Sequence, residues 1–205
     1  MALSAAAALF VQFYHPTPQI ERGPHRGIGE ALAGRVLQLA PAGARIALIA
    51  PDTSAGKFPG AAVQLPAFHE ALARAGRSVT FTNVVKLDPN RIVRAPPGDF
   101  ADILRKLNDA DVVVSLLGPP LLTPEQKARV GEKRPRVIAV CTGDMPRQVP
   151  WKALFSEGFL HAAIVSHRKP AARPPATDDP AEWFNHSFAW ATAVDAAEAL
   201  EAGRK

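Results

Sequence analysis

The sequence predicts an α/β domain with a doubly wound, mainly parallel sheet of five strands and helices on both faces, a three-layer arrangement that forms one lobe. Five short apolar segments have the length and composition of buried parallel strands. Segments with helical spacing of apolar residues separate them, and Gly or Pro stands at many of the boundaries. Because helical crossovers connect parallel strands, this alternation favours a doubly wound sheet.

The first half of the pattern begins with an amphipathic helix over residues 27–39, whose apolar positions follow a helical period. Residues 45–50 form an apolar strand, and residues 61–75 have a helical pattern that ends at Gly76, in the position of a C′ glycine. Residues 78–87 are rich in β-branched side chains, which indicates the second strand.

The second half continues the alternation. Around Phe100, apolar residues recur at i, i+3, i+4 and i+7, which predicts a helix, and residues 111–117 are a further apolar strand. Thr123 and Gln126 form a capping box with Pro124 at the first helical position. The remaining predicted elements are a strand over residues 136–141, a short helix over residues 150–157 and a strand over residues 160–166.

Three segments are predicted along the chain. Residues 1–19 are an apolar, signal-like or anchor-like segment with a linker, and residues 20–166 are the α/β domain. Residues 167–205 are a Pro-rich basic linker and an aromatic C-terminal tail. Residues 182–190 contain four large aromatic side chains, so we expect this part to pack back on the domain or on a partner.

The N-terminal segment bears on the compartment. Its apolar run, residues 5–11, is shorter than a membrane span of about 20 residues but has the length of a signal-peptide core or the outer half of an anchor. No Lys or Arg precedes it, and an apolar helix docked on the domain is the alternative. We expect a periplasmic or membrane-anchored protein with membrane contact through residues 2–14, and a cytoplasmic location is the alternative.

The composition excludes several classes of protein. The chain has 205 residues, and its single cysteine excludes a disulfide scaffold and a Cys-rich metal site within one subunit. The six histidines show no metal-ligand spacing, and no cofactor is predicted. The net charge is +5, and the basic clusters lack interleaved aromatic residues, which indicates a solvated rim and no nucleic-acid partner.

Several local strings resemble the second lobe of the type I periplasmic-binding fold, found in ABC-transporter substrate-binding proteins of the branched-chain amino-acid type. They are the helix leading into the strand over residues 45–50, the loop over residues 52–56, the helix ending at Gly76, the Asp99-Phe100 pair that begins a helix, and the turn from Cys141 to Asp144. The resemblance implies a non-enzymatic solute-binding lobe. Members of that family have two lobes that close on the ligand, so a single lobe would pair with another subunit, bind in an open crevice or have lost binding.

Ligands of open α/β sheets bind outside the carboxyl ends of the strands. Hydroxyls and amides at helix N-termini suit a carboxylate, whereas Asp52 or Asp144 suits an ammonium group, so an amino-acid-like solute is expected, as the resemblance also implies. The alternative is that these are ordinary turn and N-cap residues. The predicted ligand-binding residues are Asp52, Thr53, Ser54, Gly118, Thr142, Asp144 and Ser166.

Two other motifs suggest phosphate chemistry. Gly56-Lys57 follows a predicted strand, as in a phosphate loop. The earlier glycine and the hydroxyl residue after the lysine are both missing, so this motif is rejected. Cys141 and Arg147 have the Cys-x5-Arg spacing of a protein tyrosine phosphatase, but Asp144 would repel a phosphate dianion, and we expect Cys141 to be a buried strand-end residue.

The expected function is binding of a small polar solute or a partner subunit, without catalysis. The first alternative is a membrane-anchored interaction or structural module with no small ligand, and the second is a hydrolase that uses the Cys-x5-Arg pair. A homo-oligomer is expected, because the missing lobe and the aromatic segment leave apolar surface uncovered.

Overall fold

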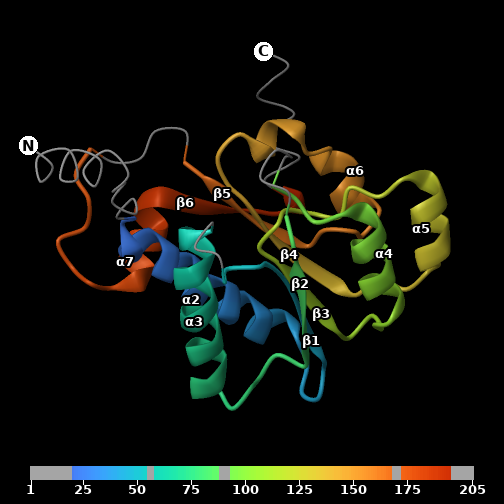
Figure 1. The fold of residues 1–205 in the computed structure, drawn as a ribbon, viewed down its shortest axis with the longest axis horizontal. Helices are drawn as coiled ribbons and strands as arrows, with labels where there is room; N and C mark the ends of the chain where they lie inside the picture. The colour runs from blue at the N-terminus through green and yellow to red at the C-terminus, as the bar shows by residue number, and fades with distance from the viewer. Residues whose placement is uncertain (1–19, 55–57, 88–92, 168–171, 195–205) are drawn as a thin grey trace, which may run out of the picture.

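A computed structural model of the chain describes residues 20–54, 58–87, 93–167 and 172–194. These residues form a six-stranded sheet in the order β2-β1-β3-β4-β5-β6, with β6 antiparallel to the rest (Figure 1). The predicted segment over residues 1–19 and the Gly56-Lys57 pair lie outside the described residues. The elements are α2 (Arg22–Leu39), β1 (Ile46–Pro51), α3 (Pro59–Arg74), β2 (Phe81–Val85), α4 (Pro97–Arg105), β3 (Val112–Ser115), α5 (Pro124–Val130), β4 (Arg136–Cys141), the 3-10 helix η1 (Met145–Gln148), α6 (Trp151–Ser156), β5 (Ala162–Ser166), α7 (Pro180–Ser187) and β6 (Phe188–Ala191).

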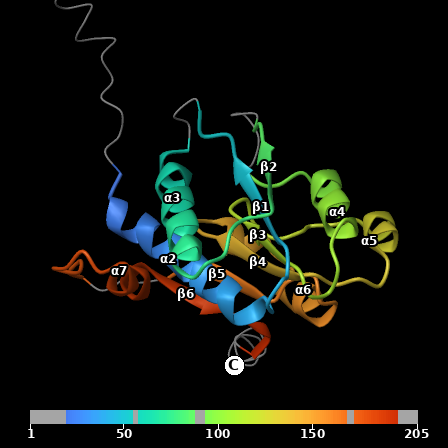
Figure 2. The same ribbon diagram turned by 90° about the horizontal axis from the view of Figure 1, so that it is seen from below.

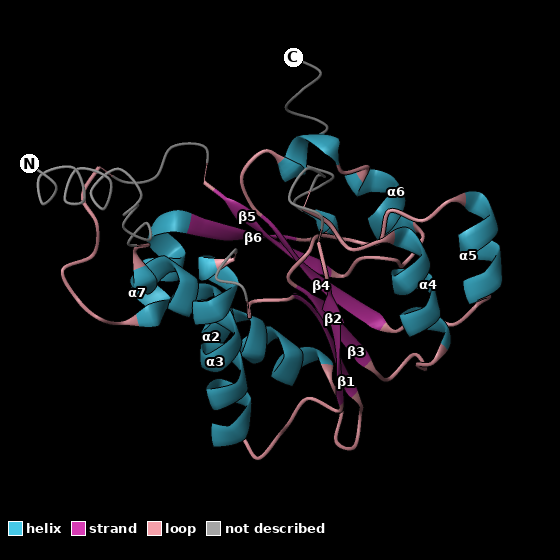
Figure 3. Ribbon diagram, in the orientation of Figure 1, coloured by secondary structure: helices cyan, strands magenta, loops and turns pink. Residues whose placement is uncertain are grey.

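Helices cover both faces of the sheet, which confirms the doubly wound α/β prediction. Helices α2, α3 and α7 lie on one face, and α4, α5 and α6 lie on the other (Figures 2 and 3). Ile28, Leu32 and Phe68 pack with alternate residues of β1, β3, β4 and β5 on the first face. Phe100 and Leu104 pack with the intervening strand residues on the second face. Both faces of β1, β3 and β4 are buried in this way. This explains why the three strands have a nearly continuous apolar sequence.

The sheet has six strands where the sequence predicts five. The additional strand, β6, comes from the aromatic segment, which packs back on the domain and pairs with β5. Asp179 caps α7 by accepting a hydrogen bond from the Ala181 amide, and the chain then alternates aromatic residues with alanine from Phe188. This alternation directs Phe188 and Trp190 toward the first face, where the Arg35 guanidinium lies 4.5 Å from the Trp190 ring centroid. The four residues of this strand are all apolar, so the sequence shows no apolar–polar alternation that would indicate a strand.

Helix α2 contacts α3 and α7 through glycines. A Cβ atom on Gly29 would lie 2.5 Å from the backbone oxygen of Gln64 in α3. A Cβ atom on Gly27 would lie 2.7 Å from the backbone oxygen of Pro180 in α7. The absence of side chains at these two positions therefore sets how closely the three helices approach each other.

A buried carboxylate joins the starts of β1 and β3. Asp111 is 2% exposed and precedes β3, whereas Arg45 precedes the neighbouring β1. The Asp111 carboxylate accepts hydrogen bonds from the Arg45 backbone amide (2.9 Å), Nε (3.0 Å) and Nη2 (2.6 Å), and from the Asn108 amide (2.9 Å). Burial raises the pKa of Asp111, but the hydrogen bonds and the charge of Arg45 outweigh burial, so the net shift of its pKa is downward.

His161 provides a pH-dependent contribution to stability. Its Nδ1 accepts a hydrogen bond from the Val137 amide at 3.2 Å, which requires an unprotonated nitrogen. Burial and the nearby charge of Arg136 lower the pKa of His161 below its ordinary value of 6.5. A lowered pKa means that the unfolded chain takes up the proton first, so this contribution is complete above pH 6.5 and is lost as the pH falls from 6.5 through the folded-state pKa.

We therefore expect the thermal midpoint to fall as the pH is lowered through this range, and His161→Gln to reduce the steepness of that fall. The matched control is His69→Gln, because His69 is exposed on α3. Thermal unfolding followed by circular dichroism at a series of pH values measures both slopes. An unchanged slope in His161→Gln would contradict the assignment.

Candidate functional site

The carboxyl ends of the parallel strands lie at one edge of the sheet, and the crossovers diverge there. From β1 the chain passes through α3 to β2, on the face of α2 and α3, and from β3 it passes through α5 to β4 on the opposite face. The loops after β1 and β3 therefore leave the sheet toward opposite faces. Ligands of open α/β sheets bind in the crevice between two such diverging loops.

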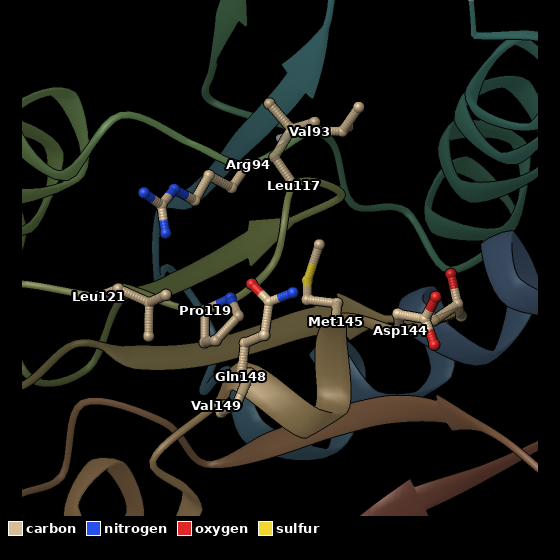
Figure 4. Close-up of a pocket in the computed structure, with 10 residues that line it drawn as sticks. Val93, Arg94, Leu117, Pro119, Leu121, Asp144, Met145, Gln148 and Val149 are labelled. Atoms are coloured by element: carbon tan, nitrogen blue, oxygen red, sulfur yellow. The ribbon is translucent and has the colours of Figure 1, made fainter. Parts of the chain in front are cut away.

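A cavity of about 210 Å3 opens at this edge, on the side of α4. The loops after β3 and β4, η1 and the segment before α4 form its walls (Figure 4). Its lining residues are Val93, Arg94, Leu117, Pro119, Leu121, Thr142, Asp144, Met145, Gln148 and Val149.

Gly118 shapes the cavity without lining it. Its φ of +83° is a conformation that favours glycine, and it lets the chain turn sharply after β3. A Cβ atom at this position would lie 2.5 Å from the Met145 sulfur, so the glycine also leaves the space that the Met145 side chain occupies. Met145 then forms the middle of the cavity wall (Figure 4).

The cavity combines apolar walls with a few polar groups. Leu117, Pro119, Leu121 and Val149 supply aliphatic surface. Figure 4 shows the Arg94 guanidinium at one end, the Asp144 carboxylate at the other and the Gln148 amide between them. Asp144 also lies 3.8 Å from Arg147, in an exposed ion pair. The cavity can therefore hold a small solute that has an apolar body and charged or polar ends.

The structure brings together only part of the predicted site. Thr142 and Asp144 line the cavity and Gly118 adjoins it. Asp52, Thr53, Ser54 and Ser166 do not line it. Asp52 accepts a hydrogen bond from the Ser54 amide at 3.0 Å in a local turn, and Ser166 pairs with Phe188 in the sheet.

Sequence reasoning missed Arg94, Met145 and Gln148. Arg94 belongs to the segment that precedes α4, and no strand end in the sequence points to it. The other two lie on η1, in a stretch where Pro146 and the preceding Gly143 indicate a turn. The only available signal was that this turn directly follows the predicted Thr142 and Asp144.

The Cys-x5-Arg pair does not form a phosphatase site. Cys141 is fully buried at the end of β4, and burial raises the pKa of its thiol to about 12. A thiol with this pKa is protonated at neutral pH and is a poor nucleophile. The Arg147 side chain is 86% exposed in its ion pair with Asp144. The expected role of Cys141 as a buried strand-end residue is therefore confirmed.

The described residues contain no group of three or more His, Cys, Asp or Glu that could hold a metal ion. Within the same part of the chain, no helix combines the length and the apolar character needed to cross a membrane.

No protein-family model matches the sequence, and no curated protein sequence matches it. The structure is similar to that of a protein from Mycobacterium smegmatis, with a TM-score of 0.52 and 12% identity over 89% of this chain and 61% of that one. It is also similar to a putative LacI transcriptional regulator from Bacteroides fragilis, with a TM-score of 0.50 and 12% identity over 85% of this chain and 61% of that one. A sugar ABC transport substrate-binding protein from Bordetella parapertussis matches with a TM-score of 0.48 and 16% identity, over 69% of this chain and 41% of that one.

These likenesses place the chain in a fold class: a doubly wound α/β domain of the kind present in the first two structures. At 12% identity they show the fold alone. The chain spans less than two thirds of the length of each of the three proteins. None of the three is described as a branched-chain amino-acid protein.

Proposed function

We propose that the protein binds a small polar solute without catalysing a reaction, and that the solute lies in the cavity beside the β3 and β4 loops. The observation that carries the proposal is the cavity, which opens at the carboxyl edge of the sheet and has apolar walls between Arg94 and Asp144. A guanidinium binds a carboxylate, and a carboxylate binds an ammonium group. An amino-acid-like solute whose carboxylate and ammonium group are separated by an apolar chain therefore suits the cavity best.

Two observations support a binding role rather than a catalytic one. Asp144 is the lining carboxylate, and it is 87% exposed and paired with Arg147, with no histidine, lysine or cysteine among the lining residues to act with it. The single thiol of the chain is buried and protonated. We further propose a periplasmic or membrane-anchored location, on the apolar character of residues 2–14.

A thermal-shift screen of the full chain against amino acids, small carboxylates and sugars tests the proposal. A ligand at 100 times its dissociation constant should raise the free energy of unfolding by about 2.7 kcal/mol. In a domain of this size, that corresponds to an increase of roughly 5–10 °C in the thermal midpoint. The ligand class that produces the shift identifies the solute.

Three variants locate the site. Arg94→Ala should weaken binding of a carboxylate ligand by about tenfold or more, because a charge-assisted hydrogen bond is lost. Thr142→Ala should weaken it less, because it removes a neutral hydroxyl. Ser54→Ala is the matched control, since Ser54 also follows a strand but does not line the cavity. Equal effects of Ser54→Ala and Thr142→Ala would contradict the location.

One observation favours the alternative of an interaction module. The cavity volume of about 210 Å3 is below the range of roughly 300–1,000 Å3 that is typical of ligand pockets. If no ligand class shifts the midpoint, the apolar walls would instead receive a side chain of a partner protein.

A further inference from the structure

Within the part of the chain that the structure describes, strand β2 is an edge strand with one unpaired side. Among the described residues it pairs with β1 alone, at the end of the sheet opposite β6 (Figure 2). The Thr80 amide donates to the Ile46 carbonyl of β1. Because backbone groups alternate between the two sides of a strand, the amides of Phe81 and Asn83 point toward the open edge.

One face of β2 is also uncovered. Thr82 is in register with Leu48, and Val84 with Ala50, on the face where α2 and α3 pack. Leu48 and Ala50 are fully buried there, whereas Thr82 is exposed and Val84 is 56% exposed. The helices therefore cover β1 and leave the adjacent residues of β2 open to solvent.

Within its five residues, β2 lacks several of the features that usually prevent strand pairing, and Lys86 is the first charged residue after it. Natural edge strands carry an inward charge, a proline, a bulge or a short length. β2 has five residues, Phe81-Thr82-Asn83-Val84-Val85, with no charge, no proline and no glycine. A strand with this composition is well suited to pair with another strand.

The strand is nearly symmetric about Asn83. Thr82 and Val84, one on either side, have β-branched side chains of similar size on the exposed face. Phe81 and Val85 are the apolar residues of the opposite face, where both contact the core. A two-fold contact requires only that the strand be complementary to itself, so that residue i faces residue j and residue j faces residue i, and Thr82 and Val84 form such a β-branched pair about Asn83.

We propose that two copies of this chain pair through β2 in antiparallel orientation about Asn83, so that both sheets join into one. Each Thr82 then faces Val84 of the partner subunit, which covers the exposed valine with a β-branched side chain. Lys86 faces Thr80 of the partner subunit, so no like charges lie opposite each other.

Sedimentation velocity at increasing protein concentration tests the association. We expect a concentration-dependent dimer, because a pair of five-residue strands makes a small interface. Val84→Lys should weaken the dimer by about tenfold, since both symmetric Val84–Thr82 contacts are lost and a charge is placed on the edge. The matched control is Leu37→Lys on α2, because Leu37 is another exposed large apolar residue, at 37%. A chain that stays monomeric at all concentrations, or a dimer equally sensitive to both variants, would overturn the proposal.

Cysteine cross-linking tests the register. In the proposed pairing Asn83 faces its own copy, with Cα atoms about 5.5 Å apart, a distance that a disulfide spans. Under mild oxidation, Asn83→Cys should form a covalent dimer. Lys86→Cys should not, because the two symmetric positions are offset by roughly 20 Å along the strands. Both variants also contain the buried Cys141, so any cross-link formed by Cys141 itself would appear equally in both. Cross-linking of Lys86→Cys to the same extent would overturn the register.

Discussion

Replacing Asp111 by alanine should lower the free energy of unfolding by about 3 kcal/mol. The carboxylate is buried and accepts hydrogen bonds from two backbone amides, those of Arg45 and Asn108, and from the Arg45 guanidinium. The variant leaves both amides without this acceptor at the start of two neighbouring strands. The Arg45 side chain is 43% exposed, so water can solvate the guanidinium and limit the loss. Urea unfolding followed by circular dichroism measures the change.

Asp102→Ala is the matched control for this prediction. Asp102 also pairs with an arginine, Arg105, at 3.4 Å, but its side chain is 62% exposed, and such pairs contribute about 0.5 kcal/mol or less. The lowered pKa of Asp111 adds a pH test. The contribution of Asp111 to the free energy of unfolding is present above pH 3.8, the ordinary pKa of the side chain, and is lost as the pH falls through the lower pKa of the folded state. Equal destabilisation by the two alanine variants would contradict the role of Asp111.

Replacing Gly29 by alanine should also destabilise the protein by about 3 kcal/mol, through overpacking. The new Cβ atom would lie 2.5 Å from the Gln64 backbone oxygen and 2.8 Å from the Ala67 Cβ atom, so α2 and α3 would have to separate. Backbone atoms of a packed helix cannot move as the end of a flexible side chain can. The same urea experiment measures the loss.

Gly34→Ala is the control on the same helix. No atom lies within 4 Å of the position where its Cβ atom would be, and Gly34 is exposed. Because glycine weakens a helix relative to alanine, this variant should raise the free energy of unfolding by roughly 0.5–1 kcal/mol. The two substitutions on α2 should therefore have opposite signs, and a shared sign would contradict the close contact between α2 and α3.

The candidate site was predictable only in part. Thr142 and Asp144 follow β4 directly, and the rule that ligands bind at the carboxyl ends of parallel strands selects them. The same rule selects Asp52 and Ser54, which lie in a local turn and do not line the cavity. The rule identifies an edge of the sheet, but the packing of side chains along that edge decides where a cavity forms.

By itself, the sequence determined the order of strands and helices and the doubly wound class, because strand burial, helical spacing and caps such as the Thr123 capping box depend on local side-chain chemistry. Only the tertiary structure decided that Arg94 meets the loop after β4, that α2 contacts α3 and α7 through Gly29 and Gly27, and that the aromatic segment from Phe188 becomes β6. These features join residues far apart in the chain. They depend on the distances between packed backbones, and a sequence pattern does not contain those distances.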